Sequence, residues 1–131
     1  MHSNLCMKQL SITPPEAMLD AVIKGLDNVK GHDITVIDLT NVVHSISSYF
    51  VIAHGTSHTQ VEALARSVEQ VCFEALGEKP SSVQGLRNGE WAIVDYFDVV
   101  IHVFHEEARS RYALEELWGD ADIRKIETEE V

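Results

Sequence analysis

Seven histidines are the side chains of this 131-residue sequence best suited to bind a metal ion. His54 and His58 flank the segment Gly55-Thr56-Ser57, and His102 and His105 lie three residues apart. Residues three apart on a strand point to opposite faces, which places His102 and His105 badly for joint coordination. The sequence has neither a His-Glu-x-x-His motif nor a Cys-x-x-Cys pair. We therefore expect no metal site and no cofactor.

The segment Gly55-Thr56-Ser57 offers a second kind of chemistry. Nucleotidyltransferases hold a nucleotide and two metal ions with a Gly-Ser turn before a helix and two acids on a nearby strand. Here the next strands offer Asp95 and Asp98, whose spacing sends them to opposite faces, and Asp98 falls in a turn. Because the carboxylate pair is missing, we interpret the segment as a tight turn with a helix cap and expect no catalytic residue. A nucleotidyltransferase-like enzyme that uses this turn and one acid is the alternative.

The charge of the chain restricts its partners. Ten Lys and Arg stand against 21 Asp and Glu, for a net charge of -11. Proteins that bind nucleic acid neutralise phosphates with Lys and Arg, so direct nucleic-acid binding as the main activity is disfavoured. An acidic surface instead favours basic protein partners.

Composition and cysteine usage indicate an ordinary globular protein of the cytoplasm. The hydrophobic fraction is 45% and the charged fraction 24%. No apolar run reaches the ~20 residues that span a bilayer, and the first dozen residues do not read as an export signal. Cys6 and Cys72 form neither a metal motif nor a disulfide framework. We expect a cytoplasmic protein without membrane contact, in which Cys72 is buried on a helix.

The pattern of the chain predicts a single α/β domain, more closely an α+β fold with one mixed β-sheet and helices packed on it. Two capping boxes, Thr13-Pro14-Pro15-Glu16 and Ser57 with Gln60, predict the starts of two helices. The expected elements in order are a helix after residue 13, strands 34–40 and 49–54, a helix from 57 to 77, an extended piece 82–86, strands 91–96 and 99–104, and a helix 106–118. We expect the domain to cover residues 14–120, between a flexible N-terminus (1–13) and an acidic C-terminal tail (121–131).

The two strands at 91–96 and 99–104 form a hairpin whose register can be predicted. If Phe97 and Asp98 make the turn, Trp91 lies opposite Phe104. Side-chain alternation then places apolar residues on one face, the core face, and a mixed set on the other. The mixed face holds Trp91, Ile93, Asp95, Val100, His102 and Phe104. Exposed aromatics with a polar neighbour are common anchors of protein interfaces, and a helix that covers this face is the alternative.

The segment from Trp91 to Trp118 resembles the ribosomal silencing factor (Iojap-like) family. Its pattern reads Trp91-x-x-x-Asp95-x-x-Asp98-Val99-x-x-His102, followed by Arg109-x-x-Tyr112-x-Leu114-Glu115-x-Leu117-Trp118. The resemblance spans about residues 15–120 and extends upstream through Lys30-Gly31-x-Asp33, Tyr49-Phe50-Val51-Ile52, Gly55-Thr56-Ser57 and Val83-x-Gly85.

This resemblance implies a translational repressor rather than an enzyme. Members bind the large ribosomal subunit at ribosomal protein fourteen and block association with the small subunit when nutrients are scarce. Organelle relatives act in large-subunit assembly, which is a further alternative here. The implied fold has a nucleotidyltransferase-like topology without the catalytic acids. Homodimerisation of the free protein through the aromatic face is also possible.

Residue roles follow from the resemblance. Trp91, Ile93, His102 and Phe104 are expected to bind the ribosomal partner. We expect the aromatic pair to be partly exposed and His102 to make binding sensitive to pH between about 5.5 and 7.5. Asp95, Asp98, His102, Arg109 and Tyr112 match fixed polar positions of the family. We expect Arg109 to pair with Asp95 or Asp98 and hold the last helix on the hairpin, and a contact with the partner is the alternative.

Two positions depart from the family pattern. Ser48 stands where an acid commonly precedes the strand aromatic, and Phe97 stands where glycine is common in the hairpin turn. A two-residue hairpin turn usually requires positive φ, which strains Phe. We therefore expect either a wider turn or a Phe97 held out at the tip by a partner.

Overall fold

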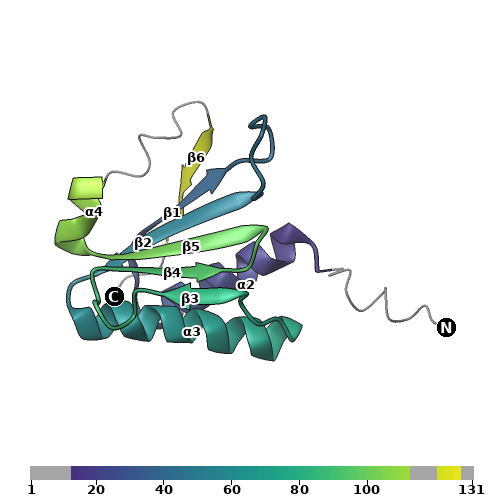
Figure 1. Cartoon of the computed structure of the whole chain (residues 1–131). Helices are drawn as coiled ribbons and strands as arrows, with labels where there is room; N and C mark the ends of the chain where they lie inside the picture. Colours follow the sequence, from purple (N-terminus) through teal and green to yellow (C-terminus); the bar gives the residue numbers. More distant parts are fainter. Residues whose placement is uncertain (1–12, 113–120, 128–131) are drawn as a thin grey trace.

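The computed structural model describes residues 13–112 and 121–127, and its centre is one six-stranded sheet (Figure 1). The strands lie in the order β3-β4-β5-β2-β1-β6. Neighbours are antiparallel except β2 and β5, which are parallel, so the sheet is mixed. The bounds are β1 His32–Asp38, β2 Tyr49–Gly55, β3 Ser82–Gln84, β4 Trp91–Asp95, β5 Val99–His105 and β6 Asp122–Lys125. The predicted fold class is confirmed.

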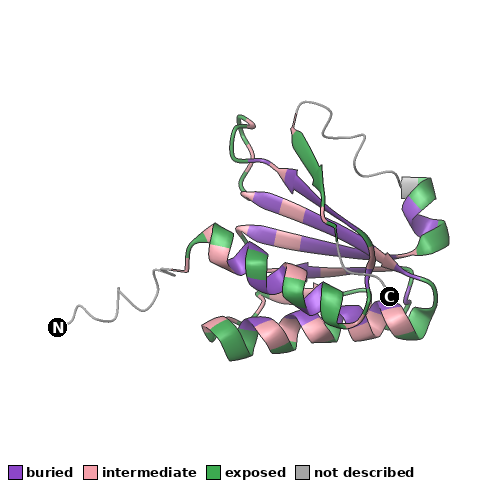
Figure 2. Ribbon diagram, turned by 180° about the vertical axis from the view of Figure 1, so that it is seen from behind, coloured by how far each residue is buried: buried purple, intermediate pink, exposed green. Residues whose placement is uncertain are grey.

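Helices α2 (Pro15–Asn28) and α3 (His58–Leu76) cover one face of the sheet (Figures 1 and 2). The N-cap predicted at Ser57 is confirmed, because Ser57 Oγ accepts a hydrogen bond from the Gln60 amide at 3.0 Å. The second half of the capping box differs, because Gln60 Oε1 accepts from the Thr56 amide at 2.8 Å rather than from the Ser57 amide. The capping box predicted for α2 is wrong. Its N-cap is Pro14, and Thr13 Oγ1 instead donates to Glu78 Oε2 at 2.7 Å. Proline at the first helical position is enough to start α2 there.

The main core lies between these helices and the sheet. Apolar side chains of α2, α3 and four strands are buried there, among them Val22, Leu26, Val36, Val51, Leu64, Val68, Cys72, Val94, Ile101 and Val103. The helices touch at Gly25, where an added Cβ would lie 2.8 Å from Val68 Cα. Only glycine therefore permits this close approach of α2 to α3. The predicted burial of Cys72 is confirmed.

The C-terminal part of the chain extends the sheet. Strand β6 pairs antiparallel with β1, with Ile37 opposite Ile123, so these residues belong to the fold rather than to a tail beyond residue 120. Lys125 Nζ adds an ion pair with Asp33 Oδ1 at 3.0 Å. The last predicted helix is present as α4 (Glu106–Tyr112), and its predicted continuation to 118 lies outside the described residues.

A second, smaller core lies on the opposite side of the sheet, which we call the far face. It is formed by Ile37, Leu39, Ile52, Phe104 and Ala108, with Val42, Phe50 and Trp91 packed against it. Among the described helices, we find none long and apolar enough to cross a membrane.

Candidate functional site: the far face of the sheet

The hairpin of β4 and β5 has the register predicted from its alternation. Trp91 pairs with Phe104 and Ile93 with His102, and the Tyr96 amide donates to the Val99 carbonyl at 3.0 Å. The helix-side residues of both strands are buried in the main core: Ala92, Val94, Val99, Ile101 and Val103. The other residues point to the far face, where Phe50 of β2 joins them because β2 runs beside β5. The assignment of the two faces is confirmed.

Phe104 is buried more deeply than its neighbours on this face. Its exposed fraction is 0%, so the expected partial exposure of Phe104 is wrong. The cause is its position on a central strand, where it packs with Ile37, Ile52 and Ala108. The Trp91 ring stacks on Phe104 with 5.0 Å between centroids and an interplanar angle of 29°. Phe104 therefore supports Trp91 from below, while Trp91 itself is only half-buried.

His102 is also buried, with 7% exposure, and it orients Trp91. The indole Nε1 of Trp91 donates to His102 Nδ1 at 3.1 Å, which places the imidazole proton on Nε2. The Phe50 ring meets the imidazole edge-on at 5.0 Å. Trp91 is thus fixed by a hydrogen bond at one side and by a stacked ring beneath.

Burial lowers the pKa of His102 to about 4, and the Asp95 charge acts in the opposite direction. An imidazole with this pKa is neutral throughout the range from about pH 5.5 to 7.5. Because His102 does not change its charge in that range, we no longer expect it to make binding sensitive to pH there.

The surface that a partner could reach on the far face is smaller than predicted. Of the four residues expected to bind, Trp91 and Ile93 are half-exposed, whereas His102 and Phe104 lie beneath them. The sequence did not point to Phe50 as a member of the accessible surface, and it placed Val100 on the mixed face without naming it as a contact. Both are half-buried and pair across β2 and β5. Side-chain alternation along β2 shows on which side of the strand Phe50 lies. That Phe50 lies next to the hairpin depends on the order of strands in the sheet, which the sequence does not reveal.

Asp95 and Asp98 shape the hairpin tip. Asp95 Oδ1 accepts a hydrogen bond from the Phe97 amide at 2.7 Å. The Asp98 carbonyl accepts from the amides of Ser48 at 2.7 Å and Tyr49 at 3.1 Å, which ties the tip to the start of β2. Both aspartates therefore have local structural contacts. Tyr112 is the last residue of α4, and its side chain lies outside the described structure.

The geometry disfavours an enzyme that combines Gly55-Thr56-Ser57 with these acids. Strands β2 and β5 are parallel, with Tyr49 opposite Val99 at one end and Gly55 opposite His105 at the other. At about 3.3 Å per residue, the Gly-Thr-Ser turn lies about 20 Å from the tip that carries Asp98. Among the described residues no group of three or more His, Cys, Asp or Glu is placed to hold a metal ion.

Arg109 fastens α4 to β1 and β2, and its expected pairing with Asp95 or Asp98 is wrong. Its Nη1 donates to the Asp33 carbonyl at 2.8 Å, and its Nη2 to Thr35 Oγ1 at 3.0 Å. Nη1 also lies 3.0 Å from His54 Nδ1, which must accept because arginine only donates. Burial and then the charge of Arg109 lower the pKa of His54, so a neutral imidazole accepts the bond.

A β-bulge explains why Arg109 finds these partners. The pairing of β1 with β2 slips by one residue between His32 and Thr35, and Asp33 there has a φ of 52°. The bulge turns the Asp33 carbonyl toward α4, and a long ion pair of 3.6 Å joins Arg109 to the Asp33 carboxylate. Arg109 therefore does hold the last helix, as expected. It does so against β1 and β2, at the end of the far face opposite the hairpin tip that carries Asp95 and Asp98.

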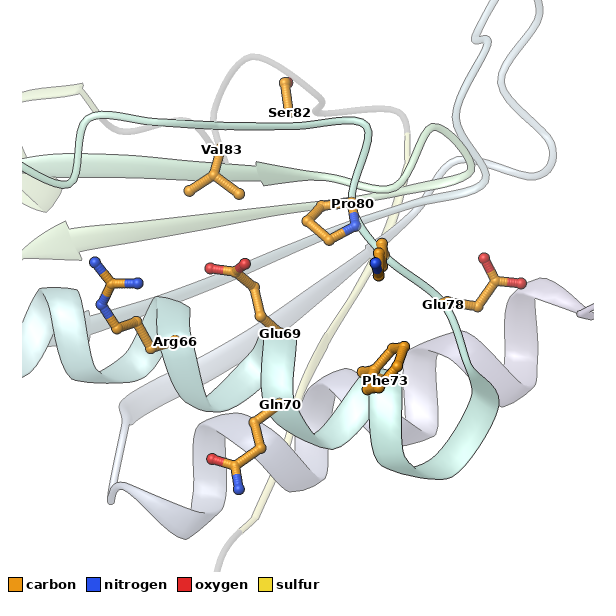
Figure 3. A pocket seen from close by; sticks show the side chains of 9 residues that line it. Arg66, Glu69, Gln70, Phe73, Glu78, Pro80, Ser82 and Val83 are labelled. Atoms are coloured by element: carbon orange, nitrogen blue, oxygen red, sulfur yellow. The ribbon is translucent and has the colours of Figure 1, made fainter.

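The hollows on the helix side of the sheet include two with volumes of about 560 and 610 Å³. The first separates α3 from the β3 edge, where Phe73 is exposed and Lys79 Nζ lies 5.6 Å above its ring (Figure 3). The second is lined by Glu16, Asp20, Asp38 and Asp122 together with Arg124. The aromatic cluster of the far face borders neither hollow.

Comparisons with known proteins agree with the fold and with the resemblance found in the sequence. The family model described as "Ribosomal silencing factor during starvation" matches residues 12–131. A ribosomal silencing factor of Bacillus subtilis is 35% identical over 112 residues, which are 86% of this chain and 93% of that protein. One from Chromobacterium violaceum is 40% identical over 97 residues, 74% of this chain and 78% of that protein.

The fold recurs in a crystal structure of a protein from Chromobacterium violaceum. It superposes with a TM-score of 0.75 at 36% identity, over 81% of this chain and 87% of that one. Sequence identity at this level over most of both chains establishes common descent as well as a common fold. The chain therefore belongs to the ribosomal silencing factor family.

Proposed function

We propose that this protein represses translation by binding the large ribosomal subunit through the far face of its sheet. The contact is made with ribosomal protein fourteen, and the bound protein occupies the surface that the small subunit needs. The central contact residues are Trp91 and Ile93, with Phe50 and Val100 beside them.

The observation that carries this proposal is the way Trp91 is held. A large half-exposed aromatic normally has several rotamers, and ordering them on binding costs free energy. Here the His102 hydrogen bond and the buried Phe104 ring fix the indole before any partner arrives. Tryptophan is among the residue types most enriched at binding hot spots, and here it shares the far face with Ile93, Phe50 and Val100.

The charge of the chain supports a protein contact over an RNA contact. The chain carries -11, and Asp95 adds a half-exposed carboxylate to the far face itself. Phosphate groups would be repelled by such a surface, whereas a basic ribosomal protein would be attracted.

Co-sedimentation tests the proposal. The purified chain should pellet with isolated large subunits and remain in the supernatant with isolated small subunits. Large subunits loaded with the chain should then form fewer joined ribosomes when small subunits are added. Equal pelleting with both subunits, or unchanged joining at saturation, would contradict the proposal.

A further inference from the structure

Three apolar side chains are exposed at one end of the sheet, and we refer to them as the tip patch. Val43 and Ile46 are each 75% exposed in the loop between β1 and β2, and Phe97 is 64% exposed at the β4–β5 turn. Both segments lie at the end of the sheet where β2 and β5 begin (Figure 1). Three large apolar side chains on two neighbouring loops at one end of the sheet are candidates for an interaction site, because exposed apolar patches commonly mark such sites.

Hydrogen bonds fasten the two segments of the tip patch to each other. Ser47 Oγ donates to the Phe97 carbonyl at 2.8 Å, and the Ser48 amide donates to the Asp98 carbonyl at 2.7 Å. The Leu39 amide donates to the Ser48 carbonyl at 2.8 Å and closes the base of the loop. The patch is therefore preorganised, which lowers the cost of binding.

The backbone at Phe97 is strained. Its φ is 76°, and the Tyr96 carbonyl accepts from the Asp98 amide at 2.9 Å across it, which makes a γ-turn with positive φ. Glycine adopts this conformation without penalty, whereas a side chain is strained there. Strain of this kind concentrates at functional sites, and here it keeps a phenyl ring on the surface.

The charges around the tip patch indicate the chemistry of its partner. Residues 39–48 and 95–99 contain no Lys or Arg, while Asp38, Asp95 and Asp98 lie on or beside these segments. An anionic surface, such as an RNA backbone or a membrane, would be repelled, and so would a second copy of this acidic chain. A basic protein surface fits the patch.

From these observations we infer that Val43, Ile46 and Phe97 dock into an apolar depression edged by Lys or Arg on a protein of the large subunit. This second contact rests on the proposed function and extends it, because Val42 of the same loop packs against the buried core of the far face, as Phe50 and Trp91 do. The far face and the tip patch would then bind the same particle together.

Two sets of variants test the tip patch in co-sedimentation with isolated large subunits. Phe97→Gly should weaken binding about tenfold while the melting temperature stays equal or rises by up to roughly 4 °C, since the turn loses its strain. The double change Val43→Ser with Ile46→Ser keeps Phe97 and should also weaken binding about tenfold. Phe73→Ser, an exposed aromatic on α3, is the matched control and should bind normally.

A charge pair at one position identifies the partner. Val43→Lys and Val43→Glu remove the same apolar side chain, and the lysine variant should bind at least threefold more weakly because it faces a basic surface. The reverse order would overturn the basic partner in favour of an anionic one. Binding within twofold of wild type for both Phe97→Gly and the double variant would overturn the tip patch, provided that the wild-type chain binds. Failure of the wild-type chain to bind would instead reject the proposed function.

Discussion

Truncation of Phe104 to alanine is expected to remove about 3–5 kcal/mol from the free energy of unfolding. The ring is fully buried, it packs with Ile37, Ile52 and Ala108, and Trp91 stacks on it. The loss therefore combines the transfer free energy of the ring with a cavity between the central strands. Urea denaturation followed by circular dichroism measures it.

A matched aromatic makes this experiment interpretable. Phe73 is 53% exposed on α3, and Phe73→Ala should cost less than about 1 kcal/mol. Because domains of this size have about 5–15 kcal/mol in total, Phe104→Ala will leave a marginal fold. Phe104→Leu fills most of the cavity and should retain enough stability for binding assays. A loss below about 1 kcal/mol for Phe104→Ala would mean that the far face has no second core.

Replacement of Trp91 by alanine is expected to weaken binding to the large subunit by about thirtyfold, or about 2 kcal/mol. The indole is half-buried, so stability should also fall, but by less than in Phe104→Ala. Trp91→Phe separates the apolar contact of the ring from the hydrogen bond of the indole, because it keeps a ring over Phe104 and loses the hydrogen bond to His102. It should retain most of the affinity if apolar contact dominates.

Trp91→Ala and Phe104→Ala should rank in opposite order when they are compared by binding affinity and by stability. The Trp91 change should mainly affect affinity, and the Phe104 change should mainly affect stability. Normal binding by Trp91→Ala, measured at a temperature where it is fully folded, would remove Trp91 from the interface.

Local patterns in the sequence predicted the hairpin and α3 correctly. The pairing of Trp91 with Phe104 follows from a short turn and strict side-chain alternation, both of which act within about fourteen residues. The N-cap at Ser57 and the helix end at Gly77, with a φ of 70°, depend on equally local geometry. Such features need no knowledge of the tertiary structure.

Contacts between distant segments explain the predictions that failed. The burial of Phe104 depends on β2 lying beside β5 and β1 lying beyond β2, which alternation within one hairpin cannot reveal. Arg109 contacts Asp33, 76 residues away, through a bulge with no sequence signature of its own. Thr13 has the residue type of a helix cap but bonds to Glu78 of the loop after α3.

Phe97 has the positive φ that two-residue hairpin turns usually require, although phenylalanine is strained in this conformation. The two-residue turn was expected to need φ above zero, and the structure has 76° there. The chain accepts this strain at an exposed position because Asp95 and Ser47 hydrogen-bond the backbone of Phe97 from both sides. The backbone at Phe97 therefore has the conformation expected of the turn. The tip-patch variants test what its side chain does.

The most direct test of the account is site-specific photocrosslinking on isolated large subunits. A photoreactive phenylalanine analogue is placed at position 93 on the far face or, as a control, at position 73 on α3, where the native residue is already aromatic and exposed. The account predicts that position 93 crosslinks to ribosomal protein fourteen and that position 73 gives no crosslink to it. A crosslink to that protein from position 73, or crosslinks from position 93 only to other components, would contradict docking through the far face.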